Sequence, residues 1–269
     1  ILFPALAQTP DLMPTVLELA GVVATDTISG EASVQVLQCG VHGTHKWRLD
    51  PEQIHGHSLV PVMEGKLDNA FCAVRPPGHH AEVSQAMGFC YFNNVAIAAR
   101  YIQQQWDIQR VGIVDFDVHH GNGTQHIFER DPTVFYYSIH QHPTFAYPGT
   151  GREFETGKDA GHGYTKNSPM LPGQGDNEYK QVLQRDLVPA FADFKPQIIL
   201  VSSGFDGHIE DNMSDIKLTT EGFTWIIKLI VELAAEHAGG RLISVLEGGY
   251  SIRRLPELAR NHIKILMEA

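Results

Sequence analysis

The chain has 269 residues, of which 43% are hydrophobic and 19% are charged, and this composition is typical of one large globular domain with a substantial core. The formal net charge of −11 argues against direct binding to nucleic acid, which needs clustered Lys and Arg, and suits a cationic partner such as a basic peptide or a polyamine. No apolar run is long enough to cross a bilayer, so membrane spanning is not expected.

The location of the protein is inferred from its cysteines and its first residues. Three cysteines are too few and too scattered for a disulfide framework, which favours a reducing compartment. The first residues lack the positively charged leader that precedes the apolar part of a signal peptide. We therefore expect a cytoplasmic protein, or a nuclear one if the source is eukaryotic.

From Asp68 onward, short β-like runs alternate with amphipathic helical stretches, whereas residues 1–66 show only loose helical character. In chain order the pattern predicts a strand within 70–80, a helix at 93–106, a strand at 110–120, a helix at 123–131, a strand at 133–140, a helix at 176–194, a strand at 197–206, a helix at 219–240 and a strand at 241–250. The Gly- and Pro-rich stretch 146–175 is expected to be one long surface loop. Apolar strands that alternate with helices indicate an α/β fold with a parallel sheet covered on both faces.

Polar residues follow five of the predicted strands at their carboxyl ends. They are His79 and His80, the run from Asp115 to His119, His140, Asp206, and Tyr250. Ligands of open α/β sheets bind outside the carboxyl ends of the strands. We therefore expect these side chains to converge on one edge of the sheet.

The segment "IVDFDVHHGNGTQ" predicts a metal site at this edge. Its Asp115, Asp117 and His119 alternate and can share one face of an extended segment. Asp206 is the best-placed further ligand. Oxygen and nitrogen donors without thiolate suit zinc, with iron or manganese as alternatives, and three protein ligands leave a coordination position open for catalysis. The alternative is a solvated strand end whose histidines bond to nearby carbonyls.

The chain resembles the histone deacetylase family, which includes bacterial deacetylase-like amidohydrolases and acetylpolyamine amidohydrolases. The resemblance rests on motifs that occur in the family's order: RPPGHHA, GFCYFNNVAIA, VDFDVHHGNGTQ, YPGTG, NSPMLPGQGD, SSGFD and LEGGY. It covers residues 68–269 and is closer to the class II branch than to class I. A family segment of the His-Pro-Glu-Arg type is missing, so residues 1–66 are divergent or truncated.

The resemblance implies a single deacetylase domain over residues 1–269. It further implies an arginase/deacetylase-like three-layer fold with a central, mostly parallel, eight-stranded sheet. The implied activity is zinc-dependent hydrolysis of the amide of an N-acetylated amine. One catalytic Zn²⁺ would be accompanied by a structural K⁺.

The resemblance also assigns site residues. The zinc ligands would be Asp117, His119 and Asp206. The catalytic set would be His79, His80, Asp115 behind His79, Asn122 near His80, and Tyr250. The potassium ligands would be Asp115, Ser138 and backbone carbonyls around Asp117, His119 and Ile139. The substrate channel would be lined by Gly88, Phe89 and Tyr147. Tyr147 stands where the family usually has Phe. Gly249 would let Tyr250 swing toward the metal.

Several alternatives stay open. Which of His79 and His80 transfers the proton is undecided, with His80 preferred. Tyr250 could instead pack over a turn, and Gly88 and Phe89 could be core residues. The expected substrate is acetyl-lysine in proteins, with acetylpolyamine or another small amide as the alternative, and the oligomeric state is open.

Two other functions compete with deacetylation. A ureohydrolase would need two manganese ions and a second Asp where His208 stands. A non-catalytic binder of acetylated ligands would not need Tyr250 and both histidines.

Overall fold

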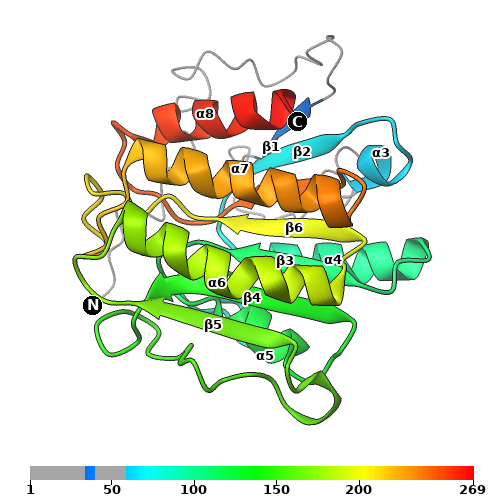
Figure 1. Ribbon diagram of the computed structural model, residues 1–269, viewed down its shortest axis with the longest axis horizontal. Helices are drawn as coiled ribbons and strands as arrows, with labels where there is room; N and C mark the ends of the chain where they lie inside the picture. The colour runs from blue at the N-terminus through cyan, green and yellow to red at the C-terminus, as the bar shows by residue number, and fades with distance from the viewer. Residues whose placement is uncertain (1–33, 40–58) are drawn as a thin grey trace, which may run out of the picture.

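The computed structural model describes residues 34–39 and 59–269, and its centre is one parallel β-sheet (Figure 1). The strands lie in the order β1-β2-β7-β6-β3-β4-β5. Their bounds are β1 Val34–Cys39, β2 Asn69–Val74, β3 Val111–Asp115, β4 Val134–Gln141, β5 Thr165–Met170, β6 Ile198–Ser203 and β7 Leu242–Leu246. All six pairings are parallel, so every strand ends at the same edge of the sheet.

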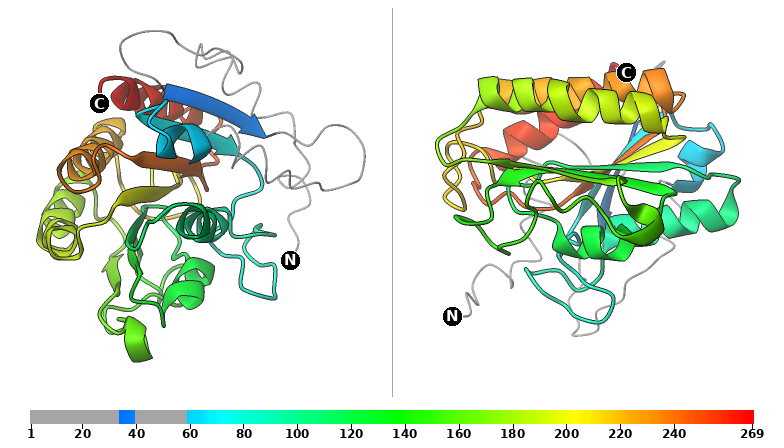
Figure 2. Two further views of the ribbon diagram at one scale, coloured as in Figure 1. Left: turned by 90° about the vertical axis from the view of Figure 1, so that its right-hand side faces the viewer. Right: turned by 60° about the horizontal axis from the view of Figure 1, so that its bottom comes forward.

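Helices cover both faces of the sheet, as the two views of Figure 2 show. On one face lie α4 Asn94–Gln105 and α5 Asn122–Phe128, and on the other lie α6 Asp176–Phe194, α7 Thr220–His237 and α8 Leu255–Met267. The short helix α3 Val60–Met63 precedes β2, and a 3-10 turn spans Asp159–Gly161. This three-layer arrangement confirms the predicted α/β fold.

Each face of the sheet has its own hydrophobic core. Along β3, Ile113 belongs to the core under α4 and α5, while the next residue, Val114, belongs to the core under α6, α7 and α8. Alternate side chains of a strand point to opposite faces, so a central strand buried on both sides must be apolar throughout. The inner strands therefore occur in the sequence as continuous apolar runs, which made them predictable.

Two helices begin at residues whose side chains cap the first turn. The Asn93 side chain accepts a hydrogen bond from Ala96 N at the start of α4, and Thr219 accepts one from Gly222 N at the start of α7. Each side chain satisfies a backbone donor that the first turn leaves unpaired. Asn93 and Thr219 are therefore the N-caps of these two helices.

The prediction of a single loop over 146–175 is wrong, because the stretch contains β5. This strand, TKNSPM, lies at the edge of the sheet and pairs only with β4. An edge strand needs no apolar run and tolerates a proline such as Pro169. The pattern that revealed the central strands was therefore absent here.

Part of the prediction for residues 1–66 can be compared with the structure. Residues 34–39 form a strand rather than part of a loosely helical region, and α3 is one short helix. The rest of that region lies outside the described residues, and so the extent of a single domain over 1–269 stays a prediction. The described sheet has seven strands, one fewer than the eight expected.

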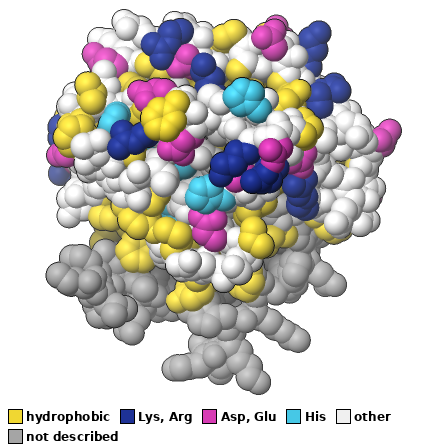
Figure 3. Space-filling model, turned by 90° about the horizontal axis from the view of Figure 1, so that it is seen from below, with side chains coloured by type: hydrophobic (Ala, Val, Ile, Leu, Met, Phe, Trp, Pro, Cys, Tyr) yellow, Lys and Arg dark blue, Asp and Glu magenta, His cyan; other side chains and the backbone are white. Residues whose placement is uncertain are grey.

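The surface carries no strong segregation of charge on the face drawn in Figure 3, where Lys and Arg are interspersed with Asp and Glu. Hydrophobic side chains gather on the lower part of this face (Figure 3). Within the part of the chain that the structure describes, no helix combines the length and apolarity needed to cross a membrane.

Candidate metal centre

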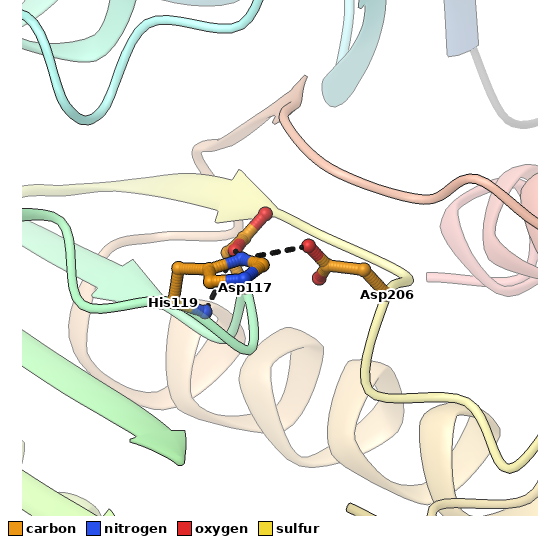
Figure 4. Close-up of side chains that lie close together, drawn as sticks. All are labelled: Asp117, His119 and Asp206. Carbon is orange, nitrogen blue, oxygen red and sulfur yellow. Dashed lines mark hydrogen bonds and ion pairs between the residues drawn. The ribbon is translucent and has the colours of Figure 1, made fainter. Parts of the chain in front are cut away.

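Asp117, His119 and Asp206 come together at the carboxyl edge of the sheet (Figure 4). Asp117 and His119 follow β3, and Asp206 follows β6, the neighbouring strand. Their ligand atoms all lie within 4.8 Å of one another. Two loops from distant parts of the sequence thus supply one group of oxygen and nitrogen donors.

The chemistry of this group fits a divalent cation. His119 Nδ1 lies 3.2 Å from Asp117 Oδ1 and 3.0 Å from Asp206 Oδ2. Among the described residues, this last oxygen is buried and has no polar contact other than that ring nitrogen. Burial and the negative charge of Asp117 raise the pKa of Asp206 to about 6. Although burial opposes it, the charges of Asp206 and Asp117 raise the pKa of His119. A cation among these groups would neutralise the two crowded carboxylates.

Backbone groups orient the two carboxylates. Gly248 N donates to Asp117 Oδ2 at 2.7 Å, and Val118 N donates to Asp206 Oδ1 at 3.1 Å. A Cβ atom at Gly248 would collide with both carboxylates, so the loop after β7 can come this close only with glycine. Each carboxylate keeps one oxygen toward the shared centre.

The paired histidines lie beside the metal centre. His79 Nδ1 is 3.0 Å from Asp115 Oδ2, and His80 Nδ1 is 2.8 Å from Asn122 Oδ1. Burial opposes protonation of His79, but the charges of Asp115 and Asp117 raise its pKa to about 10. Burial and the neighbouring His79 lower the pKa of His80. The two rings, 4.0 Å apart between centroids, therefore differ in their affinity for a proton.

Two aromatic side chains, Tyr147 and Phe89, lie beside residues of this site. The Tyr147 ring packs edge-on against His80 at 4.9 Å, and the Phe89 ring lies 6.4 Å from that of Tyr250. Both Tyr147 and Phe89 are about half exposed. Gly88 has a positive φ, and a Cβ there would collide with the His80 ring, so a larger residue would displace that ring. The structure thus brings the predicted channel residues to the edge of the metal centre.

The predicted potassium residues lie behind the metal ligands. Ser138 is the register partner of Asp115 in the pairing of β4 with β3, and its hydroxyl bonds to His140 Nδ1 at 2.8 Å. His140 in turn bonds to Gly151 O at 2.9 Å and is held in this way beneath the loop after β4. Ile139 follows Ser138 in the buried strand β4. The potassium site itself stays a prediction.

His208, which stands where a ureohydrolase would need a further carboxylate, lies outside the metal group. It is buried and bonds to Glu210 N at 3.1 Å. Within residues 59–269, no second group of three or more His, Cys, Asp or Glu side chains brings its ligand atoms as close together as Asp117, His119 and Asp206 do.

Four polar residues near the site were missed by the sequence reasoning. Tyr136 OH donates to Asp115 Oδ2 at 2.9 Å, and Asp211 Oδ2 accepts from Tyr250 N at 2.7 Å. Arg75 and Glu247 contact the loops that carry the other site residues. Glu247 had the same signal as Asp115, an acid at the end of an apolar run, but the other three had none.

The fold and the site together define an α/β protein in which a buried Asp-His-Asp group that could hold a metal ion lies beside a histidine pair. The family model described as histone deacetylase domain matches residues 56–266. The chain therefore belongs to the histone deacetylase family.

Curated relatives support this assignment. The chain is 44% identical over 191 residues to a probable deacetylase of Archaeoglobus fulgidus, covering 71% of this chain and 52% of that protein. It is 43% identical over 199 residues to a histone deacetylase-like amidohydrolase of Pseudomonas aeruginosa, covering 74% and 52%. The chain thus spans about half the length of the curated relatives it matches.

Solved structures confirm the deacetylase-like fold. The HDA15 HD domain matches with a TM-score of 0.75 and 38% identity, covering 80% of this chain and 60% of that chain. An acetylpolyamine aminohydrolase from Burkholderia pseudomallei matches with a TM-score of 0.73 and 36% identity, with the same coverage.

Proposed function

We propose that the chain is a zinc-dependent deacetylase that hydrolyses the amide of N-acetylated amines, with acetyl-lysine in proteins as the expected substrate. The observation that carries this proposal is the buried group Asp117, His119 and Asp206, whose ligand atoms converge next to the histidine pair. Membership of the histone deacetylase family supports the same reaction.

The ion would be held by Asp117, His119 and Asp206. When bound, zinc would polarise the acetyl carbonyl and make water a better nucleophile at neutral pH.

The hydrogen bonds of His80 suit it to proton transfer. The Asn122 amide donates through Nδ2 to Glu82 Oε1 at 2.5 Å, so its oxygen faces His80 Nδ1 and fixes the proton there. The Nε2 atom of neutral His80 is then free to accept a proton from water and return it to the leaving amine. Because the pKa of His79 is raised to about 10, its protonated ring donates through Nδ1 to Asp115 Oδ2 and adds positive charge next to His80.

Tyr250 is suited to stabilise the oxyanion. Burial, together with the charges of Asp206 and Asp117, raises the pKa of its phenol, which therefore stays protonated and can donate a hydrogen bond. Phe89 and Tyr147 would line the path of the acetylated arm.

The remaining parts of the proposal concern the wider protein. K⁺ would bind at Asp115, Ser138 and the carbonyls of Asp117, His119 and Ile139. Residues 1–269 would form one domain, in the cytoplasm or in a nucleus.

The first experiment is a hydrolysis panel on zinc-loaded protein. Acetyl-lysine peptides, acetylpolyamines and small acylated amines are compared, and zinc is counted by elemental analysis, with one ion per chain expected. Tyr250→Phe should lower kcat by at least ~100-fold, as expected for the loss of one oxyanion donor. Tyr164→Phe, which changes a tyrosine packed against Phe194, is the matched control and should keep the wild-type rate.

The panel also decides between substrate classes. An acetylpolyamine aminohydrolase among the structural matches makes acetylpolyamines the second candidate. If all the amides remained intact while acetylated ligands still bound, the chain would be a binder of acetylated ligands and the proposal would be wrong.

A further inference from the structure

The loops after β2 and β7 carry the residues proposed to move protons and to stabilise the oxyanion. The two strands are neighbours in the sheet and run parallel, with Cys72 opposite Val245. The β2 loop carries His79 and His80, and the β7 loop carries Tyr250. Both loops must keep one position relative to each other if their side chains are to act on the same substrate.

A carboxylate from the β7 loop holds the β2 loop. Glu247 is fully buried, and its Oε2 accepts hydrogen bonds from Gly78 N at 2.6 Å and His79 N at 3.2 Å. Its Oε1 accepts one from the Ser202 hydroxyl at 3.0 Å. Both carboxylate oxygens are therefore occupied by groups of the protein itself, so Glu247 is suited to hold the loop in place.

An arginine from the β2 loop holds the β7 loop in return. Arg75 Nη2 donates to Gly249 O at 3.0 Å, and its guanidinium carbon lies 5.5 Å from the centre of the Tyr250 ring. A cation at this distance from an aromatic ring is attracted to it. Gly249 has a φ of +125°, which glycine alone adopts readily, so the backbone next to Tyr250 depends on outside contacts for its position.

We propose that Arg75 and Glu247 are positioning residues that together form a reciprocal brace between the two loops. This inference rests on the proposed deacetylase function. Arg75 would aim the Tyr250 hydroxyl, and Glu247 would fix the backbone that carries His79. A displacement of about 1 Å at a catalytic group can cost up to ~100-fold in rate, so loss of either contact should lower kcat.

A double-mutant experiment tests the role of Arg75. Arg75→Met should lower kcat by ~10- to 100-fold with KM within about 3-fold of wild type, because the Tyr250 hydrogen bond strengthens in the transition state. In a Tyr250→Phe background, the same change should cost less than about 3-fold, since the hydroxyl it aims is gone. Equal losses in both backgrounds would show a general structural effect and overturn the proposal.

Conservative variants test whether hydrogen bonds carry the effect. Arg75→Lys retains the cation and should recover part of the lost rate. Glu247→Gln can still accept from both backbone amides and should stay within about 3-fold of wild type, whereas Glu247→Ala should lose ~10-fold in kcat. If Glu247→Gln were as slow as Glu247→Ala, the charge rather than the brace would matter, and the proposal would fail.

Arg241→Met is the matched control for Arg75→Met. Arg241 precedes the other end of β7 and donates to Gln197 O at 2.8 Å, so its loss removes a similar side-chain to backbone bond far from the site. This variant should keep the wild-type kcat.

Hydrogen exchange tests the brace independently of catalysis. Peptides covering residues 247–252 should exchange faster in Arg75→Met than in wild type, and those covering 77–80 faster in Glu247→Ala. Unchanged exchange in both would overturn the brace. If the wild type hydrolysed nothing, the proposed function would fail, while these exchange rates would still decide whether the brace exists.

Discussion

His262 on α8 lies in the core beneath the sheet, where its Nδ1 atom has no hydrogen-bond partner among the described residues. Its ring lies 4.9 Å from that of Phe71 and 6.0 Å from that of Phe205. Burial in this apolar environment lowers the pKa of His262 to about 3. The folded chain thus keeps a neutral imidazole at a pH where the unfolded chain would protonate it.

This burial should make the protein sensitive to acid. Because the pKa of His262 is lower in the folded chain than in the unfolded chain, the neutral ring makes its full contribution to the free energy of unfolding above about pH 6.5. This contribution is lost as the pH falls toward 3, at roughly 1.4 kcal/mol per pH unit. Urea denaturation of metal-free protein across this range measures the slope of the free energy of unfolding against pH. His262→Phe should flatten it, whereas His162→Phe, at an exposed histidine, should leave it unchanged. An unaltered slope in His262→Phe would contradict the assignment.

The starts of α6 and α7 are tied together by one carboxylate. Asp176, the first residue of α6, accepts from Thr219 N at 2.9 Å and from the Thr219 hydroxyl at 2.7 Å. The same hydroxyl oxygen accepts from Gly222 N at 3.2 Å and so caps α7. One threonine therefore ends a loop, starts a helix and joins two helices on the same face of the sheet.

Thr219→Val should destabilise this helical layer. Valine keeps the shape but removes both the cap and the bond to Asp176, which should lower the free energy of unfolding by about 1–2 kcal/mol. The urea midpoint measures the loss. Thr224→Val is the control, since its hydroxyl bonds only to Thr220 O within the same helix and should cost less. Equal losses in the two variants would mean that the cap makes no special contribution.

At the scale of the whole molecule, the inner strands and the edge where the site lies could be predicted from sequence. Buried parallel strands are apolar throughout, and polar residues stand out at their ends, as Asp115 and Asp206 do. The edge strand β5 could not be predicted in this way, because within the described sheet it has a neighbouring strand on one side only. The expected number of strands, eight, came from the family resemblance and not from periodicity, and the described sheet has seven.

The contacts that hold the site together could not be predicted from sequence. Glu247 meets Gly78 across 169 residues of sequence, and Arg75 meets Gly249 across 174. Such partners are decided by the order of strands in the sheet, which places β2 next to β7. Residue types at strand ends indicate candidate chemistry, whereas the three-dimensional pairing decides which side chain supports which.

The proposed metal centre would link the stability of the whole molecule to its proposed activity. Zinc that binds only the folded state stabilises it by about 4 kcal/mol at 1,000 times its Kd. Without a cation, Asp117 and Asp206 repel each other, and the raised pKa of Asp206, about 6, means that its ionised form destabilises the fold above that pH.

Asp206→Asn should therefore have two opposite effects at pH 8. The metal-free variant should be about 1–3 kcal/mol more stable than metal-free wild type, because one of two crowded charges is removed. Zinc should raise the melting temperature of wild type by ~10 °C and that of the variant far less, since a ligand is lost. Asp186→Asn, at a buried carboxylate bonded to Ser168, should keep the full zinc-dependent shift. If Asp206→Asn kept it as well, Asp206 would not be a metal ligand.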